Sequence, residues 1–211
     1  NQPESVVLAV RSDLFTGDYP GIDFITISDS EFKSISSTVA SQGVLALVKR
    51  PESLSDDSVP ADPFILVLDR LADPGNFGTI LRTAEAIGLK EVWYTAGSAD
   101  PFSDKVIRAA MSAQFKVQLR QIPDLEDLEG KLEQFGYSKI YRTDPHQGVD
   151  CFKEPGLFEK TALIIGNEAN GAASLAGAVD VTIPMPGSAE SLNAAQAATV
   201  FLFEFVRRSN L

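Results

Sequence analysis

The stretch Ile183-Pro-Met-Pro-Gly-Ser-Ala-Glu-Ser-Leu-Asn-Ala194 joins a strand end, a tight loop and a helix start. Branched residues at 181–183 predict a strand, and the two prolines end it because they fix φ and lack an amide donor. Ser188 or Ser191 is predicted to cap the next helix, since a hydroxyl there accepts an unpaired N–H. Asn193 then falls in the first helical turn, from which its side chain can reach across a cleft. The loop holds more polar groups than a structural turn requires.

The composition bounds the class of protein. The 211 residues, 44% of them hydrophobic, predict one large or two small globular domains. The sequence contains neither a long apolar run nor a charged-then-apolar leader, so we expect no transmembrane helix, no secretory signal and a cytoplasmic location. The single cysteine, Cys151, is typical of a reducing compartment. Together with the single histidine, His146, it argues against a zinc site and predicts no metal.

The formal net charge of −11 restricts the kind of partner. A large, non-specific surface for nucleic acid would need an excess of lysine and arginine, which this chain lacks. A local basic patch remains compatible with the composition.

The chain divides at a segment rich in proline, serine and acid, residues 51–63, which is typical of a linker. Before it, residues 1–50 hold three short β-type runs and a polar helix-like stretch, which predict a small α/β module. After it, residues 64–211 alternate apolar strands with amphipathic helices. This alternation predicts an α/β fold with a mostly parallel sheet and helices on both faces. The strands are expected at 64–68, 92–94, 115–119, 140–142, 162–165 and 181–183, and the helices at about 77–87, 103–113, 125–135 and 192–207.

Two further polar loops follow predicted strands, where open α/β sheets bind their ligands. In the first, Asn76 begins a helix and Arg82 lies within it, away from the apolar stripe. Taken alone, Arg82 is typical of a surface arginine paired with Glu85 or solvent. In the second, Gly166 directly follows a strand and permits close approach of a ligand. Glu168 in that loop would suit a cationic ligand, although an ordinary strand-to-helix turn explains the same residues.

Together the three loops resemble the three motifs of the SpoU-type (TrmH-like) RNA ribose methyltransferases of the SPOUT superfamily. The resemblance covers about residues 64–207 and rests on three groups in the expected order: Asn76 with Arg82-Thr83-Ala84, Gly166-Asn167-Glu168, and Ile183-Pro184-Met185 with Ser191-Leu192-Asn193. It implies S-adenosyl-L-methionine as the methyl donor and a ribose 2′-hydroxyl of structured RNA as the acceptor. It also implies a C-terminal trefoil knot and a homodimer.

The resemblance implies a role for each motif residue. Arg82 would stabilise the developing alkoxide and hold the adjacent phosphate, because a guanidinium stays protonated and is a poor base. Asn76 would orient Arg82 or the ribose, and Glu168, Ser191 and Asn193 would position the substrate. The cofactor pocket would be lined by Gly166, Ile183, Met185 and Leu192.

Residues 1–50 resemble part of an L30e-like RNA-recognition domain, which favours ribosomal over transfer RNA as the substrate. Two departures from the family pattern stand out, at Ala110–Ala113 and at Ala195. The final helix is apolar almost all round and should be buried on several sides, with a dimer interface implied by the resemblance. Dimerisation could gather basic residues around one cleft, namely Arg70, Arg82, Lys105, Arg108, Arg142, Arg207 and Arg208.

Two other functions remain open from the sequence. The first is a non-catalytic RNA-binding or assembly protein that retains the SPOUT fold. The second is a generic nucleotide-binding α/β protein, against which the lack of a glycine-rich phosphate loop argues.

Overall fold

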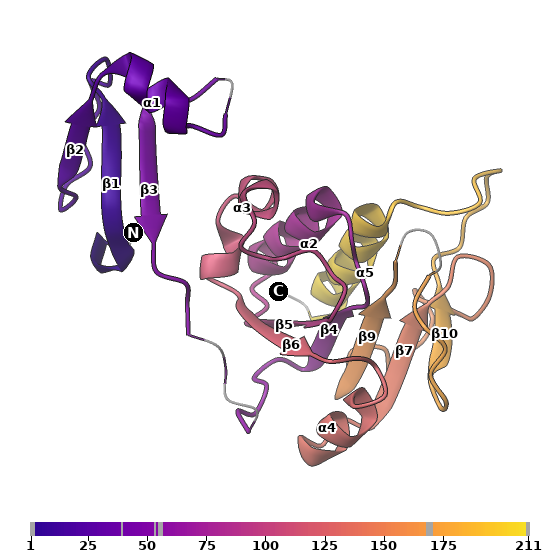
Figure 1. Ribbon diagram of the computed structural model, residues 1–211. Helices are drawn as coiled ribbons and strands as arrows, with labels where there is room; N and C mark the ends of the chain where they lie inside the picture. Colours follow the sequence, from indigo (N-terminus) through magenta and orange to yellow (C-terminus); the bar gives the residue numbers. More distant parts are fainter. Residues whose placement is uncertain (1–2, 39, 53, 55–56, 168–170, 210–211) are drawn as a thin grey trace. The chain divides into compact units, whose positions relative to one another are not determined.

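A computed structural model describes residues 3–38, 40–52, 54, 57–167 and 171–209. The chain forms two compact units, Asn1–Pro51 and Glu52–Leu211. The first unit begins with a short 3-10 turn, η1 (Pro3–Ser5), and contains a three-stranded sheet with the order β2-β1-β3 (Figure 1). Strands β1 (Val6–Ser12) and β2 (Phe24–Ile27) are parallel, and β3 (Val44–Val48) is antiparallel to β1. These are the three predicted β-type runs.

Helix α1 (Asp29–Ile35) of the first unit begins with a complete capping box. The Ser28 side chain accepts a hydrogen bond from the Glu31 amide, and the Glu31 carboxylate accepts one from the Ser28 amide. This reciprocal pair satisfies two amides that a helix start leaves unpaired. The helix buries Phe32. The predicted polar helix between β2 and β3 is therefore confirmed.

The second unit contains a seven-stranded sheet with the order β6-β5-β4-β9-β7-β10-β8 (Figure 1). Every pairing in this sheet is parallel, as the alternation of strands and helices predicts. The strands are β4 (Phe64–Leu68), β5 (Glu91–Thr95), β6 (Gln118–Ile122), β7 (Lys139–Thr143), β8 (Val149–Asp150), β9 (Thr161–Ile165) and β10 (Val179–Thr182).

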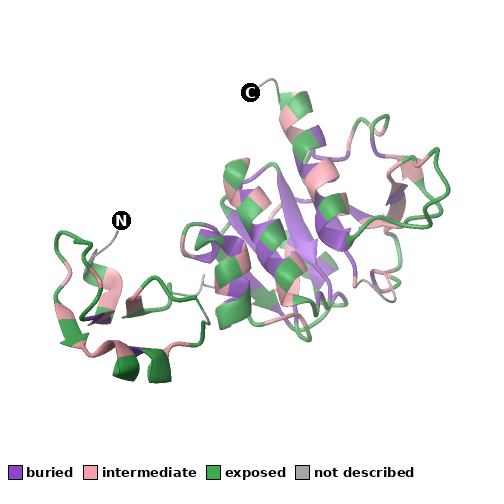
Figure 2. Cartoon of the chain, turned by 90° about the horizontal axis from the view of Figure 1, so that it is seen from above, coloured by how far each residue is buried: buried purple, intermediate pink, exposed green. Residues whose placement is uncertain are grey.

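Helices cover both faces of this sheet. Strand β4 shows why: Phe64, Leu66 and Leu68 join one apolar cluster, whereas Ile65 and Val67 join the other. The first cluster includes side chains of α2 (Pro74–Ala86), α3 (Asp104–Ala110) and α5 (Ala194–Ser209), and the second includes those of α4 (Leu128–Gln134). Figure 2 shows the buried strands between helices whose outer sides are exposed.

Several predicted boundaries shift for local reasons. Helix α3 ends at Ala110 rather than 113, because Met111 and Ser112 adopt left-handed conformations with φ of 50° and 69°. The 3-10 turn η2 (Ala113–Phe115) then includes Phe115, which was predicted as the first strand residue, and β6 begins at Gln118. Strand β8 was not predicted, because two residues carry no recognisable alternation.

The described part of the predicted linker packs on the second unit over residues 58–63. The Asp62 carboxylate accepts hydrogen bonds from the Lys90 and Glu91 amides, at 2.9 and 3.1 Å. Arg120, which is 3% exposed, donates to the Ser58 carbonyl over 2.8 Å. Residues 58–63 therefore pack against the sheet of the second unit, although their composition is typical of a linker.

The prediction that the final helix is buried on several sides is confirmed in part. The helix packs against α2, and its Phe205 ring also contacts the rings of Phe64 and Phe158, whereas Phe203 is 52% exposed. Among the described residues no helix is both long and apolar enough to cross a membrane.

Candidate functional site

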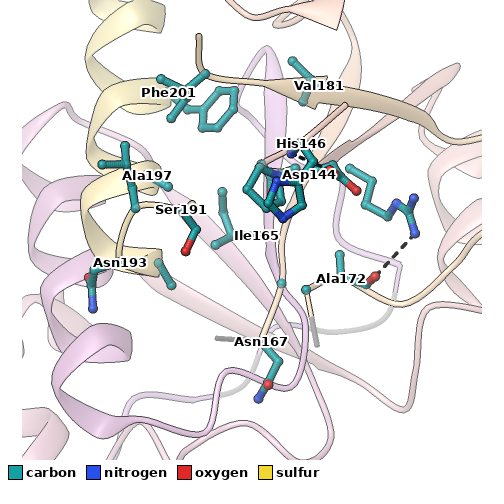
Figure 3. A pocket seen from close by; sticks show the side chains of 18 of the residues that line it. Asp144, His146, Ile165, Asn167, Ala172, Val181, Ser191, Asn193, Ala197 and Phe201 are labelled. Carbon is teal, nitrogen blue, oxygen red and sulfur yellow. Dashed lines mark hydrogen bonds between the residues drawn. The ribbon is translucent and has the colours of Figure 1, made fainter. Parts of the chain in front are cut away.

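A cavity of about 590 Å³ lies at the carboxyl ends of β7, β9 and β10, beside the start of α5. Ligand pockets in proteins typically measure about 300–1,000 Å³, and open α/β sheets bind ligands at this edge. Figure 3 shows Phe201, Ala197 and Ser191 on the α5 side of the cavity and His146, Asp144 and Ala172 on the opposite side. The lining consists of residues 142–146, 165–167, 171, 172, 181, 183, 185, 190–194, 197 and 201.

The structure brings two of the three motif loops together in this lining. The four residues predicted to bind the cofactor, Gly166, Ile183, Met185 and Leu192, all line the cavity, as do Ser191 and Asn193. Glu168, the remaining residue predicted in these two loops, lies outside the described residues. The two loops lie side by side because β9 and β10, which precede them, both flank β7 in the sheet.

The backbone packing around position 166 requires a glycine there. A Cβ atom at this position would lie 1.8 Å from the Ala172 amide nitrogen, where no side chain fits. The backbones of Asn167 and Gly171 pair with each other through N–H···O distances of 3.2 and 2.8 Å. The sequence suggested close approach of a ligand at Gly166, whereas the structure shows that the backbone of Gly171 and Ala172 approaches it.

Asp69, which the sequence analysis did not select, fixes this loop to the end of β4. Its carboxylate is 2% exposed and accepts hydrogen bonds from the Ala173 amide at 2.9 Å and the Thr95 hydroxyl at 3.0 Å. The Asn167 side chain donates to the Arg70 carbonyl over 2.9 Å. These contacts hold the segment after β9 against the segment after β4, and so fix the floor of the cavity.

Asn193 connects the third loop to the first. Its Oδ1 atom accepts hydrogen bonds from the Ala195 and Gln196 amides, at 2.9 and 3.4 Å, which makes Asn193 the N-cap of α5. The predicted caps, Ser188 and Ser191, are therefore wrong, because the helix begins at Ala194. The Asn193 Nδ2 atom donates to the Asn76 Oδ1 atom over 2.9 Å. The Asn193 side chain therefore reaches the first turn of the neighbouring helix α2.

Arg82 lies on α2 six residues beyond Asn76, which is about 9 Å along the helix axis. It is exposed, as the apolar stripe predicts, and does not line the cavity. Glu85, the partner that a structural role would require, instead pairs with Lys116 at 2.8 Å. Arg82 has no ion pair among the described residues.

Four of the other basic residues that were expected around a cleft form ion pairs within the chain, and two of these, Arg207 and Arg208, share one carboxylate. Arg142 pairs with Asp180 at 2.6 Å, Arg70 with Asp69 at 3.1 Å, and Arg207 and Arg208 both with Glu204 at 2.7 Å. Within the described part of the chain, Arg82, Lys105 and Arg108 on α2 and α3 are exposed without an ion pair. Among the seven residues expected around a cleft, these three are therefore the ones whose charge no described carboxylate offsets.

The turn after β7 contributes cavity residues that sequence reasoning missed. Thr143 donates from its hydroxyl to the Ile164 carbonyl over 3.0 Å, and the Asp144 Oδ1 atom accepts from the His146 amide at 2.8 Å. Their position directly after a predicted strand was the available signal, because strand ends of a parallel sheet meet at one edge.

The described residues form neither a metal centre nor a reactive thiol site. No group of three or more potential metal ligands exists among the described residues. Burial raises the pKa of the Cys151 thiol to about 12, so this cysteine is not a nucleophile at neutral pH.

Comparison with known proteins identifies the class of this fold and cavity. The sequence model of the SpoU rRNA methylase family matches residues 63–203. Among solved structures, the SpoU methyltransferase AviRb from Streptomyces viridochromogenes in complex with AdoMet superposes with a TM-score of 0.82 at 26% identity, covering 97% of this chain and 83% of that one. An AdoMet-bound rRNA methyltransferase from Sinorhizobium meliloti gives 0.81 at 28% identity, covering 98% and 81%.

Among curated proteins, the Bacillus subtilis (strain 168) enzyme named 23S rRNA (guanosine(2553)-2′-O)-methyltransferase RlmP is 34% identical over 92% of this chain and 75% of its own length. The 23S rRNA (uridine(2479)-2′-O)-methyltransferase of Streptomyces viridochromogenes is 33% identical over 78% of this chain and 60% of its own length. The chain belongs to the SpoU rRNA methylase family. The predicted family, the predicted enzyme class of methyltransferase and the predicted donor, S-adenosylmethionine, are confirmed.

Proposed function

We propose that this protein transfers the methyl group of S-adenosylmethionine to a ribose 2′-hydroxyl of ribosomal RNA. The observation that carries the proposal is the convergence of the three motifs. Two of them line one cavity, and the Asn193–Asn76 hydrogen bond of 2.9 Å ties that cavity to the helix that bears Arg82. A non-catalytic assembly protein would not require this connection.

The cavity suits the proposed cofactor. Ile165, Val181 and Phe201 give it an apolar side for the adenosine, and the Asp144 carboxylate gives it a negative group for a cation. Gly166, Ile183, Met185 and Leu192 would hold the cofactor. When bound, S-adenosylmethionine supplies an electrophilic methyl group on a positively charged sulfur.

The chain's own residues would orient and activate the ribose. Arg82 would hold the phosphate next to the target nucleotide and stabilise the negative charge that develops on the 2′-oxygen. Asn76, held by Asn193, would orient the ribose, and Ser191 would line its approach from the cavity. Glu168 would complete the site. The proton would leave to phosphate or water, because a guanidinium cannot accept it.

A homodimer would explain the exposed apolar residues near the start and middle of α5. Leu192 is 37% exposed and Phe203 is 52% exposed, and an interface would remove both from water. A sedimentation measurement at micromolar concentration tests this, and a monomeric mass would contradict it. The return of the chain after β10 to place α5 against α2 is compatible with the proposed trefoil knot.

We also propose that the first unit is a partial L30e-like RNA-recognition module, joined through residues 51–63 to a methyltransferase domain at 64–211. The exposed cations of α2 and α3 would then supply the local positive surface that the overall negative charge does not. The single unpaired cysteine fits a cytoplasmic location. No metal is needed for this chemistry.

The proposal is tested by methylation of purified RNA. Ribosomal and transfer RNA from cells that lack this protein are incubated separately with it and with S-adenosylmethionine labelled in the methyl group. We expect label in ribosomal RNA at a 2′-O-methyl nucleotide. Label on a base, or in transfer RNA alone, would contradict the proposed substrate. RNA binding without any label would favour the assembly protein.

A further inference from the structure

Arg70 lies at the carboxyl edge of the large sheet, between the ends of β5 and β9. It follows the end of β4, the strand that separates those two. Its amide donates to the hydroxyl of Thr95, the last residue of β5, over 2.8 Å, and its carbonyl accepts from the Asn167 side chain at 2.9 Å. Asn167 lines the cavity, and Figure 3 shows its side chain pointing away from Ile165. Arg70 is therefore in direct contact with a residue of the cavity wall.

The backbone of Arg70 has a left-handed conformation, with φ of 48°. This conformation strains a residue that carries a Cβ atom, and glycine adopts it more readily. Such strain persists where neighbouring contacts hold the backbone in place, and the bonds to Thr95 and Asn167 do so here. Both bonds use only backbone atoms of Arg70, so a glycine would make them with less strain. The position therefore carries an arginine against the preference of its own backbone.

The fold makes little use of the Arg70 side chain, which is 50% exposed. Its Nη2 atom donates to the Asp69 carboxylate over 3.1 Å, but that carboxylate already accepts from the Ala173 amide and the Thr95 hydroxyl. Its aliphatic part passes Gly97, where a Cβ atom would lie 3.5 Å from Cγ of Arg70. A guanidinium has five N–H donors, and the described part of the chain engages one of them.

A half-exposed guanidinium beside the cavity suits a phosphate, because its planar fork of donors matches the phosphate oxygens. In the proposed function the cofactor fills the cavity, so the RNA reaches the methyl group across the adjoining edge of the sheet, where Arg70 lies. Asp69, which is 2% exposed, holds one N–H of the guanidinium and so reduces the freedom that binding would cost.

We propose that Arg70 binds a backbone phosphate of the RNA and holds the strand beside the cavity. This contact explains why a strained position keeps an arginine, since the side chain serves the substrate and not the fold. Phosphate contacts fix the register of a nucleic acid without reading its sequence. The proposal rests on the proposed function and adds a residue that the three motif groups do not contain.

Two substitutions in the full chain separate RNA binding from folding. Arg70→Gly and Arg70→Ala both remove the guanidinium, but only glycine relieves the left-handed backbone. Filter binding should show that both variants bind ribosomal RNA about three- to tenfold more weakly than native protein, the size of a half-exposed hydrogen bond to a charged group. Their thermal midpoints should nevertheless differ, with Arg70→Gly higher than Arg70→Ala by about 2–4 °C. The dissociation constant for S-adenosylmethionine should stay native in both.

Lys160→Gly is the matched control. Lys160 is also an exposed cation in a left-handed conformation, with φ of 53°, but it precedes β9 at the opposite edge of the sheet. Its removal should leave RNA affinity native. The dependence of RNA affinity on salt should become shallower in Arg70→Gly, by up to about one in the slope, and not in Lys160→Gly. Arg70→Lys should retain part of the affinity, because an ammonium still binds phosphate as a point charge.

Native RNA affinity in both Arg70→Gly and Arg70→Ala would overturn the proposal. A weakening confined to the less stable variant would also overturn it, because the effect would then follow folding. Weaker binding of S-adenosylmethionine with unchanged RNA affinity would assign Arg70 to the cofactor and overturn it as well. Absence of methylation by the native protein, with the RNA affinities as expected, would instead overturn the proposed function and leave this contact standing.

Discussion

The Asn193 Nδ2 atom donates a hydrogen bond to the Asn76 Oδ1 atom over 2.9 Å, which joins the first turns of α5 and α2. The same Asn193 side chain caps α5 through its Oδ1 atom. Asn76 in turn donates its backbone amide to Asp73, the cap of α2, over 2.7 Å. One side chain therefore both begins a helix and fixes the distance between the cavity and the helix that carries Arg82.

Substitution of Asn193 separates these two roles. Asn193→Ser should retain the cap but is too short to reach Asn76, so its free energy of unfolding should stay close to native while turnover falls. Asn193→Ala loses both contacts and should also lose about 1 kcal/mol of stability. Urea unfolding and methylation rates measure the two effects. Equal stability of the two variants would show that Asn193 does not cap α5.

Gly166→Ala should destabilise the second unit. The added Cβ would lie 1.8 Å from the Ala172 amide nitrogen, so the backbone at Gly171 and Ala172 must move, at a cost of at least about 2 kcal/mol. Gly187→Ala is the matched control, because no atom lies within 4 Å of its Cβ position. Thermal unfolding of both variants checks the prediction, and an equally small change in both would contradict it.

The protein should lose stability in acid through Glu204 on α5. Hydrogen bonds from Arg207, with those from Arg208, lower the pKa of Glu204 from 4.5 to about 2. Because this pKa is lower in the folded state, the stabilisation is complete above about pH 4.5 and is lost as the pH falls toward 2. Urea unfolding between these pH values should show a steeper loss in the native protein than in Glu204→Gln. An equal loss of stability with falling pH in the native protein and in Glu204→Gln would contradict the assignment of this acid sensitivity to Glu204.

Ser112→Gly should stabilise the turn between α3 and η2. Ser112 has φ of 69°, which costs a residue with a Cβ about 1–2 kcal/mol, partly offset by the greater freedom of glycine in the unfolded chain. We expect a gain of up to about 1 kcal/mol. Ser103→Gly, at φ of −68°, should instead lower the stability. Thermal unfolding distinguishes the two, and a loss in Ser112→Gly would contradict the assigned strain.

The sequence predicted those features that depend on local pattern. The alternation of β4 with α2 indicated the parallel sheet, and the motif residues Gly166, Met185 and Leu192 fall in one cavity as expected. Features that depend on contacts between distant segments could not be predicted. The support that Asp69 gives to Ala173 joins residues more than a hundred positions apart, and the apolar pattern of α5 does not distinguish the exposed Phe203 from the buried Phe201.

The left-handed backbone conformations of Met111 and Ser112 also could not be predicted from the sequence. The pair Met111–Ser112 contains no glycine, so nothing in the residue types announced two successive left-handed residues or the resulting shift of β6 to Gln118. By contrast, Asp144 and His146 could have been predicted as cavity residues, because both follow closely after a strand that the apolar pattern predicts.

We propose that Arg82 serves the methyl acceptor and not the cofactor or the fold. It is exposed, lies outside the cavity and makes no ion pair with Glu85, so its removal should leave the cofactor site unchanged. Arg82→Lys should recover little activity, because the planar fork of donors is lost. Glu85→Ala, on the same helix, controls for helix stability.

The most direct test is single-turnover methylation of ribosomal RNA by Arg82→Ala, combined with calorimetry of S-adenosylmethionine binding. We expect the methylation rate to fall at least about a hundredfold, as for removal of an oxyanion-stabilising group, while the dissociation constant for the cofactor stays within about twofold of native. A near-native rate in this variant would contradict the account.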